Sequence, residues 1–218
     1  MKAKMIILAA SSTLLFGAYA NATTEHIATS NNQEVTAVEM HQDLHSSMLK
    51  MKENMSKGMA FNHPDYAFAA GMLPHHVGAV DMAKVELQYG KDPQMIQLAK
   101  NIIAAQDKEI KEMQYWLAEH KTDSTQKTDK ISQEMHKELK ISMQKMQHNM
   151  MQGMSYNDPD VAFAAGMLPH HVGAVDMAKV ELKYGKNPQM RQLAKNIIAA
   201  QGPEIKEMKE WLKQHSTN

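Results

Sequence analysis

The chain contains no cysteine, and this absence removes several classes of site at once. Without thiols there is no disulfide framework, no thiolate metal centre and no covalent attachment point for haem. Methionine, histidine and carboxylates are then the remaining metal-binding side chains. Methionine suits an exported protein, because a thiol outside the cytoplasm is liable to be oxidised to a disulfide whereas a thioether is not.

The chain also has no excess of positive or negative charge, since 24 basic residues balance 24 acidic residues. Removal of Lys2 and Lys4 with a leader peptide would leave 22 basic residues against 24 acidic residues. Such a chain has no electrostatic footprint for nucleic acid or for an anionic membrane. No segment alternates in the manner of a β-strand, and no segment after the leader is long and apolar enough to span a bilayer. We therefore expect an all-α protein that binds no nucleic acid and has no membrane anchor.

The amino-terminal residues 1–22 have the organisation of a secretory signal. Two lysines precede an apolar stretch, and Ala20, Asn21 and Ala22 offer small residues for cleavage. An uncleaved anchor needs roughly 20 predominantly apolar residues, and this stretch is shorter and interrupted by serine and threonine. We predict cleavage after Ala22 and a periplasmic or secreted protein.

The chain is instead rich in internal repetition and in methionine, with 21 methionines in 218 residues. Ala67–Leu87 returns without a change as Ala162–Leu182. After a flexible tail at 23–37, we predict a helical repeat at 38–120, a polar linker at 121–130 and a second helical repeat at 131–218.

Each repeat is predicted to contain three helices. In the first repeat they cover about 34–57, 64–89 and 93–120, and the second repeat has equivalent segments. Glycines are expected to end the first and second helices, and a cap residue followed by proline to begin the third. Three helices per repeat allow either two separate bundles or one shared bundle. Pro74 and Pro169 lie inside the second helices and are expected to kink them.

The repeated segment is built around Met-x-x-His-His, which places sulfur and imidazole on one broad helix face. Two buried, hydrogen-bonded histidines in a methionine-lined core would be the ordinary structural alternative. The unchanged return of the whole segment favours metal ligation. The candidate ligands on the second helices are Met72, His75, His76 and Met82, with Met167, His170, His171 and Met177 in the second copy.

A methionine stripe runs along the first helix of each repeat. Methionine commonly fills irregular cores, but its flexibility specifies packing poorly, and leucine is displaced here almost throughout. We therefore expect about half of the stripe to be ordinary core and keep the rest as candidate ligands. His41 recurs as His136, whereas His45 becomes Lys140, which argues against a common site at His45. The additional candidates are Met48, Met51, Met55 and His41, with Met143, Met146, Met150 and His136.

The third helix carries Gln106, Glu109, Met113 and Trp116 on one face, and the second copy repeats the pattern. Met113, with its equivalent Met208, is a candidate ligand. Glu109 can orient a histidine through its second ring nitrogen. A hydrogen bond from Glu109 to backbone or lysine is the structural alternative.

The motif Met72-Leu73-Pro74-His75-His76, with the later pattern Gln106-x-x-Glu109-Ile110-x-x-Met113-x-x-Trp116, resembles the exported bacterial CopM-like copper-resistance family, formerly a domain of unknown function. The resemblance covers both repeats. It implies a ferritin-like helical fold and copper binding outside the cytoplasm, with ligands at the matching methionines and histidines.

These patterns predict a non-enzymatic copper-binding protein that sequesters or carries copper for resistance or homeostasis. Thioether and imidazole favour Cu(I), with Ag(I) and Cu(II) as further ions, and delivery would involve another periplasmic copper-handling protein. A methionine-rich interaction module without metal and a non-covalent haem protein remain alternatives. A ferritin-like metal oxidase is less favoured, because Glu-x-x-His occurs nowhere in the chain.

Overall fold

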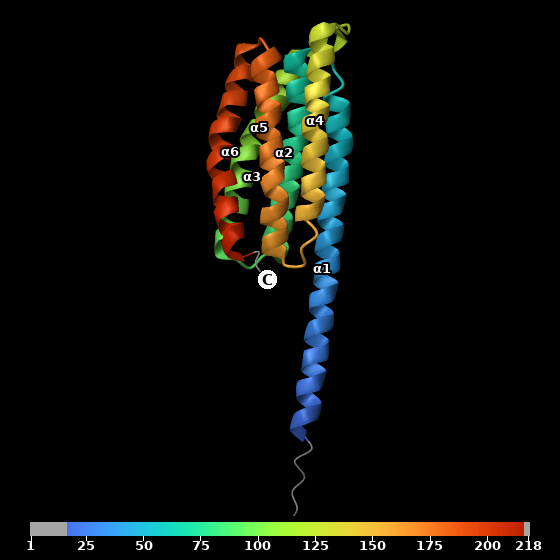
Figure 1. Ribbon diagram of the computed structural model, residues 1–218, viewed down its shortest axis with the longest axis vertical. Helices are drawn as coiled ribbons and strands as arrows, with labels where there is room; N and C mark the ends of the chain where they lie inside the picture. The colour runs from blue at the N-terminus through green and yellow to red at the C-terminus, as the bar shows by residue number, and fades with distance from the viewer. Residues whose placement is uncertain (1–16, 216–218) are drawn as a thin grey trace, which may run out of the picture. The chain divides into compact units, whose positions relative to one another are not determined.

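The computed structural model describes the backbone of residues 17–215 and the side chains of residues 35–215 (Figure 1). The described part is all-α, as predicted, and contains no strand. No helix in it is long and apolar enough to cross a membrane. The elements in chain order are α1 Gly17–Gly58, α2 Pro64–Tyr89, α3 Pro93–Glu119, the short 3₁₀ helix η1 Lys121–Thr125, α4 Lys130–Gly153, α5 Pro159–Tyr184 and α6 Pro188–His215.

The helix boundaries after Gly58 agree closely with the prediction, and local chemistry explains them. Asp92 caps α3 by accepting hydrogen bonds from the amides of Gln94 and Met95, ahead of proline in the first turn. Asp129 and Ser132 form a reciprocal capping box at the start of α4. These caps satisfy amides that have no partner within the helix.

The prediction for the amino-terminal segment is wrong in one respect. The helix α1 begins at Gly17 rather than near Glu34, so the whole of the predicted flexible tail 23–37 is helical. That segment contains neither proline nor glycine, and nothing in it interrupts the helical hydrogen bonds. Residues 1–16 of the predicted signal lie outside the described residues. Residues 1–36 and 37–218 are two compact units, and the second contains both repeats.

The two repeats share one hydrophobic core in residues 37–218, so they form a joint bundle rather than two separate ones. α2 and α5 pack against each other, with α3 on α2 and α6 on α5 (Figure 1). α1 contacts α4, since Ser56 Oγ lies 3.8 Å from the sulfur of Met143. His41 Nε2 donates to the carbonyl of Tyr156 at 2.9 Å, and His136 Nε2 donates to that of Phe61 at 2.8 Å. This exchange of equivalent contacts shows that the repeats are related by an approximate two-fold axis.

The glycines at the ends of α1 and α4 allow the backbone of the next helix to approach closely. No described glycine has a positive φ, although a glycine at the end of a helix commonly adopts the left-handed conformation. Pro74 removes the amide that would pair with the carbonyl of Ala70, and a Cβ added at Gly58 would overlap that carbonyl oxygen. Pro169, Ala165 and Gly153 repeat the arrangement. The helix backbones therefore meet where each internal proline frees a carbonyl, and both α2 and α5 continue as single helices through the proline.

Buried carboxyl groups join the repeats at their ends. Asp65 at the start of α2 accepts hydrogen bonds from the amides of Lys186 and Asn187 before α6, at 2.9 and 2.7 Å. Asp160 caps the segment before α3 in the same way. Burial, together with the neighbouring Asp160, raises the pKa of Glu86 to about 9. Burial and Asp65 raise the pKa of Glu181 to about 9. The side chains of Glu86 and Glu181 are therefore neutral carboxyl groups at neutral pH.

Replacement of Gly58 or Gly153 by alanine is expected to destabilise the fold by about 1–3 kcal/mol, because the added methyl group meets a backbone oxygen that cannot easily move. Urea unfolding followed by circular dichroism measures the change. Gln152→Ala, at the exposed residue beside Gly153, is the control and should change stability by less than about 0.5 kcal/mol. Equal stability of Gly153→Ala and Gln152→Ala would contradict the close approach.

The double variant Glu86→Gln/Glu181→Gln is expected to gain stability relative to the native protein as pH rises from 5 to 9. The folded state holds protons on both glutamates up to about pH 9, while the unfolded chain releases them near its ordinary pKa. The native protein thus loses stability through this window, by at most about 1.4 kcal/mol per pH unit for each glutamate. Thermal melts across the range test this, with the exposed Glu134→Gln as the charge control. Parallel curves for native protein and double variant would show that the two glutamates are already ionised in the folded state.

Candidate metal centre

Both histidine pairs lie in the middle of the bundle, where α2 packs against α5. His75, His76, His170 and His171 are all fully buried. The rings of His75 and His170 are in direct contact, with centroids 3.7 Å apart, although the two residues belong to different repeats. Within each repeat the two neighbouring rings are 6.0 Å apart. The fold therefore brings four imidazoles together at its approximate two-fold axis.

The outer histidine of each pair is held by a glutamate from the third helix of its own repeat. His76 Nε2 lies 2.6 Å from Glu109 Oε2, and His171 Nε2 lies 2.7 Å from Glu204 Oε2. This confirms the predicted pairing of Glu109 with a histidine. An ionised carboxylate only accepts hydrogen bonds, so Nε2 carries the proton and Nδ1 of a neutral ring carries a free lone pair. The glutamates are about one-fifth exposed, at 19% and 20%, so they are the part of this network that reaches solvent.

Several imidazole nitrogens at this centre have no hydrogen-bond partner. They are Nδ1 of His76, His170 and His171 and both ring nitrogens of His75. His170 Nε2 is satisfied by the carbonyl of His75 at 3.1 Å. Buried polar atoms are nearly always paired, and an unpaired one costs roughly 1–3 kcal/mol. A group of them at one place is unusual for core packing alone and is typical of atoms that serve as ligands.

Burial keeps the inner histidines neutral. Loss of solvation lowers the pKa of His75 well below its ordinary value, and the neighbouring His170 and His76 lower it further. Burial, with His171 and His76, lowers the pKa of His170 in the same way. A metal ion binds the neutral form of imidazole, so these rings are in the ligating state at neutral pH.

The methionines predicted as ligands on the second and third helices are all buried at no more than 1% exposure. Two of them reach across to the other repeat. A Cβ built at Gly71 would lie 3.4 Å from the methyl carbon of Met177, and one at Gly166 would lie 3.2 Å from that of Met82. Each of these glycines lies one helical turn before a central histidine. The full set is Met72, Met82, Met113, Met167, Met177 and Met208.

The methionine stripes of α1 and α4 belong mainly to the core. Met51 packs against Gly78 and Met146 against Gly173, where no Cβ could be accommodated, so both fill space between helices. His41 and His136 each donate a hydrogen bond to a backbone carbonyl of the opposite repeat. The remaining candidates Met48, Met55 and Met150 are buried, and Met143 is half-buried.

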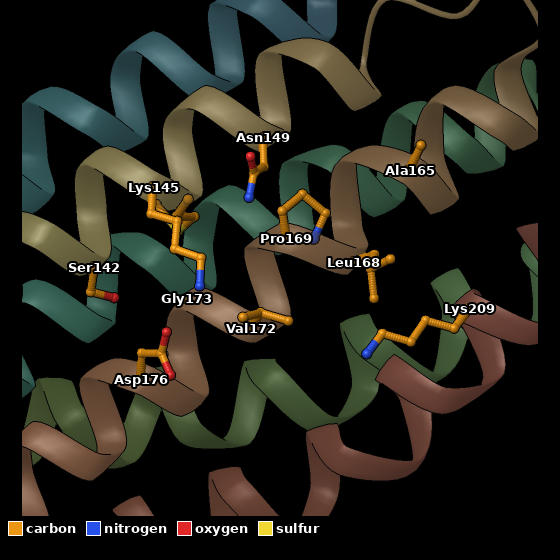
Figure 2. Close-up of a pocket in the computed structure, with 11 residues that line it drawn as sticks. Ser142, Lys145, Asn149, Ala165, Leu168, Pro169, Val172, Gly173, Asp176 and Lys209 are labelled. Carbon is orange, nitrogen blue, oxygen red and sulfur yellow. The ribbon is translucent and has the colours of Figure 1, made fainter.

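Two equivalent hollows on the surface surround the internal prolines. The hollow at Pro169 has a volume of about 290 Å³, and the one at Pro74 about 240 Å³. Figure 2 shows Lys145 and Asp176 beside the first of them. No histidine lines either hollow, so neither belongs to the central cluster.

Among the described residues, no three His, Cys, Asp or Glu side chains are grouped so that they could hold a metal ion. A centre at the four histidines must therefore draw on methionine sulfur. The contact between His75 and His170 was not predictable, because the spacing of the motif does not say that α2 packs on α5. The acidic pairs Glu86–Asp160 and Glu181–Asp65 were also missed, and the signal for them was a glutamate on the same helix face as the methionines and histidines.

Comparison with known proteins adds to this geometry. The family model described as "Domain of unknown function (DUF305)" matches residues 65–216. The solved structure "CopM in the Cu(I)-bound form" is similar to this chain with a TM-score of 0.53 and 31% identity, over 69% of this chain and 96% of that one. "CopM in the Ag-bound form (by soaking)" has a TM-score of 0.52 and 32% identity over 69% and 96%.

A curated relative is the uncharacterized protein L153 of Acanthamoeba polyphaga mimivirus. It is 44% identical over 57 residues, which are 26% of this chain and 38% of that protein. The chain thus spans little more than a third of that relative's length.

His75 and His170 are expected to remain neutral at pH 5.5 in the folded protein, because burial opposes their protonation. Ring ¹⁵N chemical shifts followed from pH 7.5 to 5 measure this directly. The unfolded chain takes up these protons near pH 6.5 and the folded state does not, so stability should fall as pH drops below that value. Protonation of either ring near pH 6.5 with the fold intact would contradict a sealed centre.

Proposed function

The chain belongs to the DUF305 family, and we propose that it is a periplasmic copper-binding protein that sequesters or carries Cu(I) at the central histidine and methionine cluster. The cluster of buried, unpartnered imidazole nitrogens carries this proposal. Similarity to CopM, whose solved structures include Cu(I)-bound and Ag-bound forms, supports it.

The donor set favours a soft monovalent ion. Thioether sulfur prefers Cu(I) and Ag(I), and imidazole serves either oxidation state of copper. Carboxylates, which would suit harder ions, do not join the centre as a group in the described part of the chain. Glu109 and Glu204 instead act on the histidines, since each holds a ring in the orientation that leaves Nδ1 for the metal.

Binding would convert unsatisfied nitrogens into ligands. Nδ1 of His76 or His171 would supply nitrogen from an outer ring, and His75 or His170 would supply it at the axis, with no more than two of these imidazoles on one ion. Met82 and Met177, which reach across the repeats one helical turn from the central histidines, are the sulfur donors that we propose to join them. Because His75 and His170 are already neutral, a metal ion entering at neutral pH displaces no proton from them.

The role we propose is storage or hand-over without catalysis, outside the cytoplasm after removal of the signal. A thioether and imidazole shell holds Cu(I) less tightly than thiolates would, which suits transfer to another copper-handling protein. The alternative of a methionine-rich docking surface has little support, because among the described residues Met151 is the only exposed methionine.

An anaerobic Cu(I) competition titration tests the proposal. His76→Ala/His171→Ala should weaken binding more than about tenfold, and Glu109→Gln/Glu204→Gln by about tenfold to a hundredfold, the usual effect of losing the group that orients a ligand. Affinity should persist to about pH 6 and fall at lower pH as protons compete. The lowered pKa of His75 and His170 moves this competition to lower pH than an ordinary histidine would show.

The matched control is His120→Ala/His215→Ala, which removes one histidine from each repeat outside the centre. These histidines stack on Trp116 and Trp211 with ring centroids 4.1 Å apart. Circular dichroism verifies that both double variants remain folded. The same Cu(I) affinity in the His76/His171 and His120/His215 variants would overturn the proposed centre.

A further inference from the structure

A second cluster of histidine and methionine lies at the surface, away from the central histidines. A cavity of about 610 Å³ between α1 and the end of α4 is lined by the chemically distinctive residues His41, His45, Met48, Met151 and Met154. We infer that this cavity is an exposed binding site for a soft monovalent metal ion, Cu(I) or Ag(I), present once in the chain. The inference rests on the proposed function only in taking the same kind of metal ion.

The α1 side of the cavity presents three donors on one helix face. His41, His45 and Met48 are spaced at i, i+4 and i+7, so their side chains lie in one row. His41 is oriented by the hydrogen bond that Nε2 donates to the carbonyl of Tyr156 at 2.9 Å. A carbonyl only accepts, so the neutral ring has its lone pair on Nδ1. The ring is therefore held in the tautomer that can ligate a metal through Nδ1.

The α4 side supplies sulfur that ordinary packing does not explain. Met151 is 59% exposed, whereas the other described methionines are buried or half-buried. The two-fold partner of Met151 is Ser56, and Ser56 Oγ lies 3.8 Å from the sulfur of Met143, the partner of Met48. The approximate symmetry therefore places Met151 beside Met48. Three methionines and two histidines in the lining of one open cavity match the preference of Cu(I) and Ag(I) for thioether and imidazole ligands.

The equivalent place in the other half of the bundle has lost this chemistry. Lys140 stands where the first repeat has His45, and Ser56 stands where the second has Met151. His136 and Met143 remain, and His136 makes the same backbone contact as His41. The recurrent histidine is thus explained by the fold, while His45 and Met151 occur at one end only. A packing role would apply to both ends, so the difference points to a ligand at one of them.

The chain supplies its own matched variants for the test. His45→Lys/Met151→Ser converts the proposed site into its partner, and Lys140→His/Ser56→Met performs the reverse change. Ag(I), which does not change oxidation state during the experiment, is titrated into the full chain carrying ¹³C-labelled methionine methyl groups. The methyl resonances of Met48 and Met151 should shift in the native protein. The Met48 shift should disappear in the first variant, and Met143 should gain a shift in the second.

Binding stoichiometry measured in the same titrations should fall by one ion in the first variant and rise by one in the second. The variant His76→Ala/His171→Ala separates this inference from the proposed function, because its surface resonances should still respond. A response at Met48 that survives His45→Lys/Met151→Ser, or native Met48 and Met151 resonances that do not move, would overturn the surface site. Failure of the central site alone would leave the surface response intact.

Discussion

The packing of α2 against α5 brings the two histidine pairs together, and the candidate centre depends on it. Between these helices, Gly71 and Gly166 leave room for the methyl carbons of Met177 and Met82 from the opposite repeat. This packing places His75 and His170 in ring contact at the approximate two-fold axis, where water is excluded and both rings are neutral. Four imidazoles that would be ordinary surface residues on isolated helices thereby become a buried group of potential ligands.

The packing of α2 against α5 is also stabilised at the ends of the bundle, where hydrogen bonds link one repeat to the other. Asp65 and Asp160 satisfy backbone amides of the opposite repeat, and His41 and His136 bind carbonyls across the same boundary. Each repeat therefore depends on the other for hydrogen bonds to some of its backbone amides and carbonyls. This explains why duplication gave one joint bundle with a common core rather than two bundles on a linker.

Much of the fold was predictable because local signals agree with one another. Proline after a cap residue marks the starts of α3 and α6, and the apolar period marks the buried faces of the helices. The hydrogen bond between Glu109 and a histidine was one of two alternatives that the residues of the third helix allowed, and the structure shows it. The ring contact between His75 and His170 did not follow, because a helix face records what is buried and not which helix buries it. The start of α1 was missed because a polar segment without proline or glycine carries no clear stop signal.

A comparison of the two ends of the bundle separates packing from chemistry. Approximate symmetry requires that a residue needed for the fold recur in both halves, and His41 with His136 meets that requirement through the same backbone contact. His45 and Met151 do not recur, and Met151 is exposed, so neither is required by the core. The central histidines recur, and each has at least one ring nitrogen without a hydrogen-bond partner, which packing does not explain either. The two proposed sites thus rest on different departures from ordinary packing. One departure is symmetric and buried, and the other is asymmetric and exposed. An exposed site would exchange ions readily with solvent or with another protein, whereas a buried site would be shielded from both. Uptake and retention can therefore be divided between different parts of one bundle.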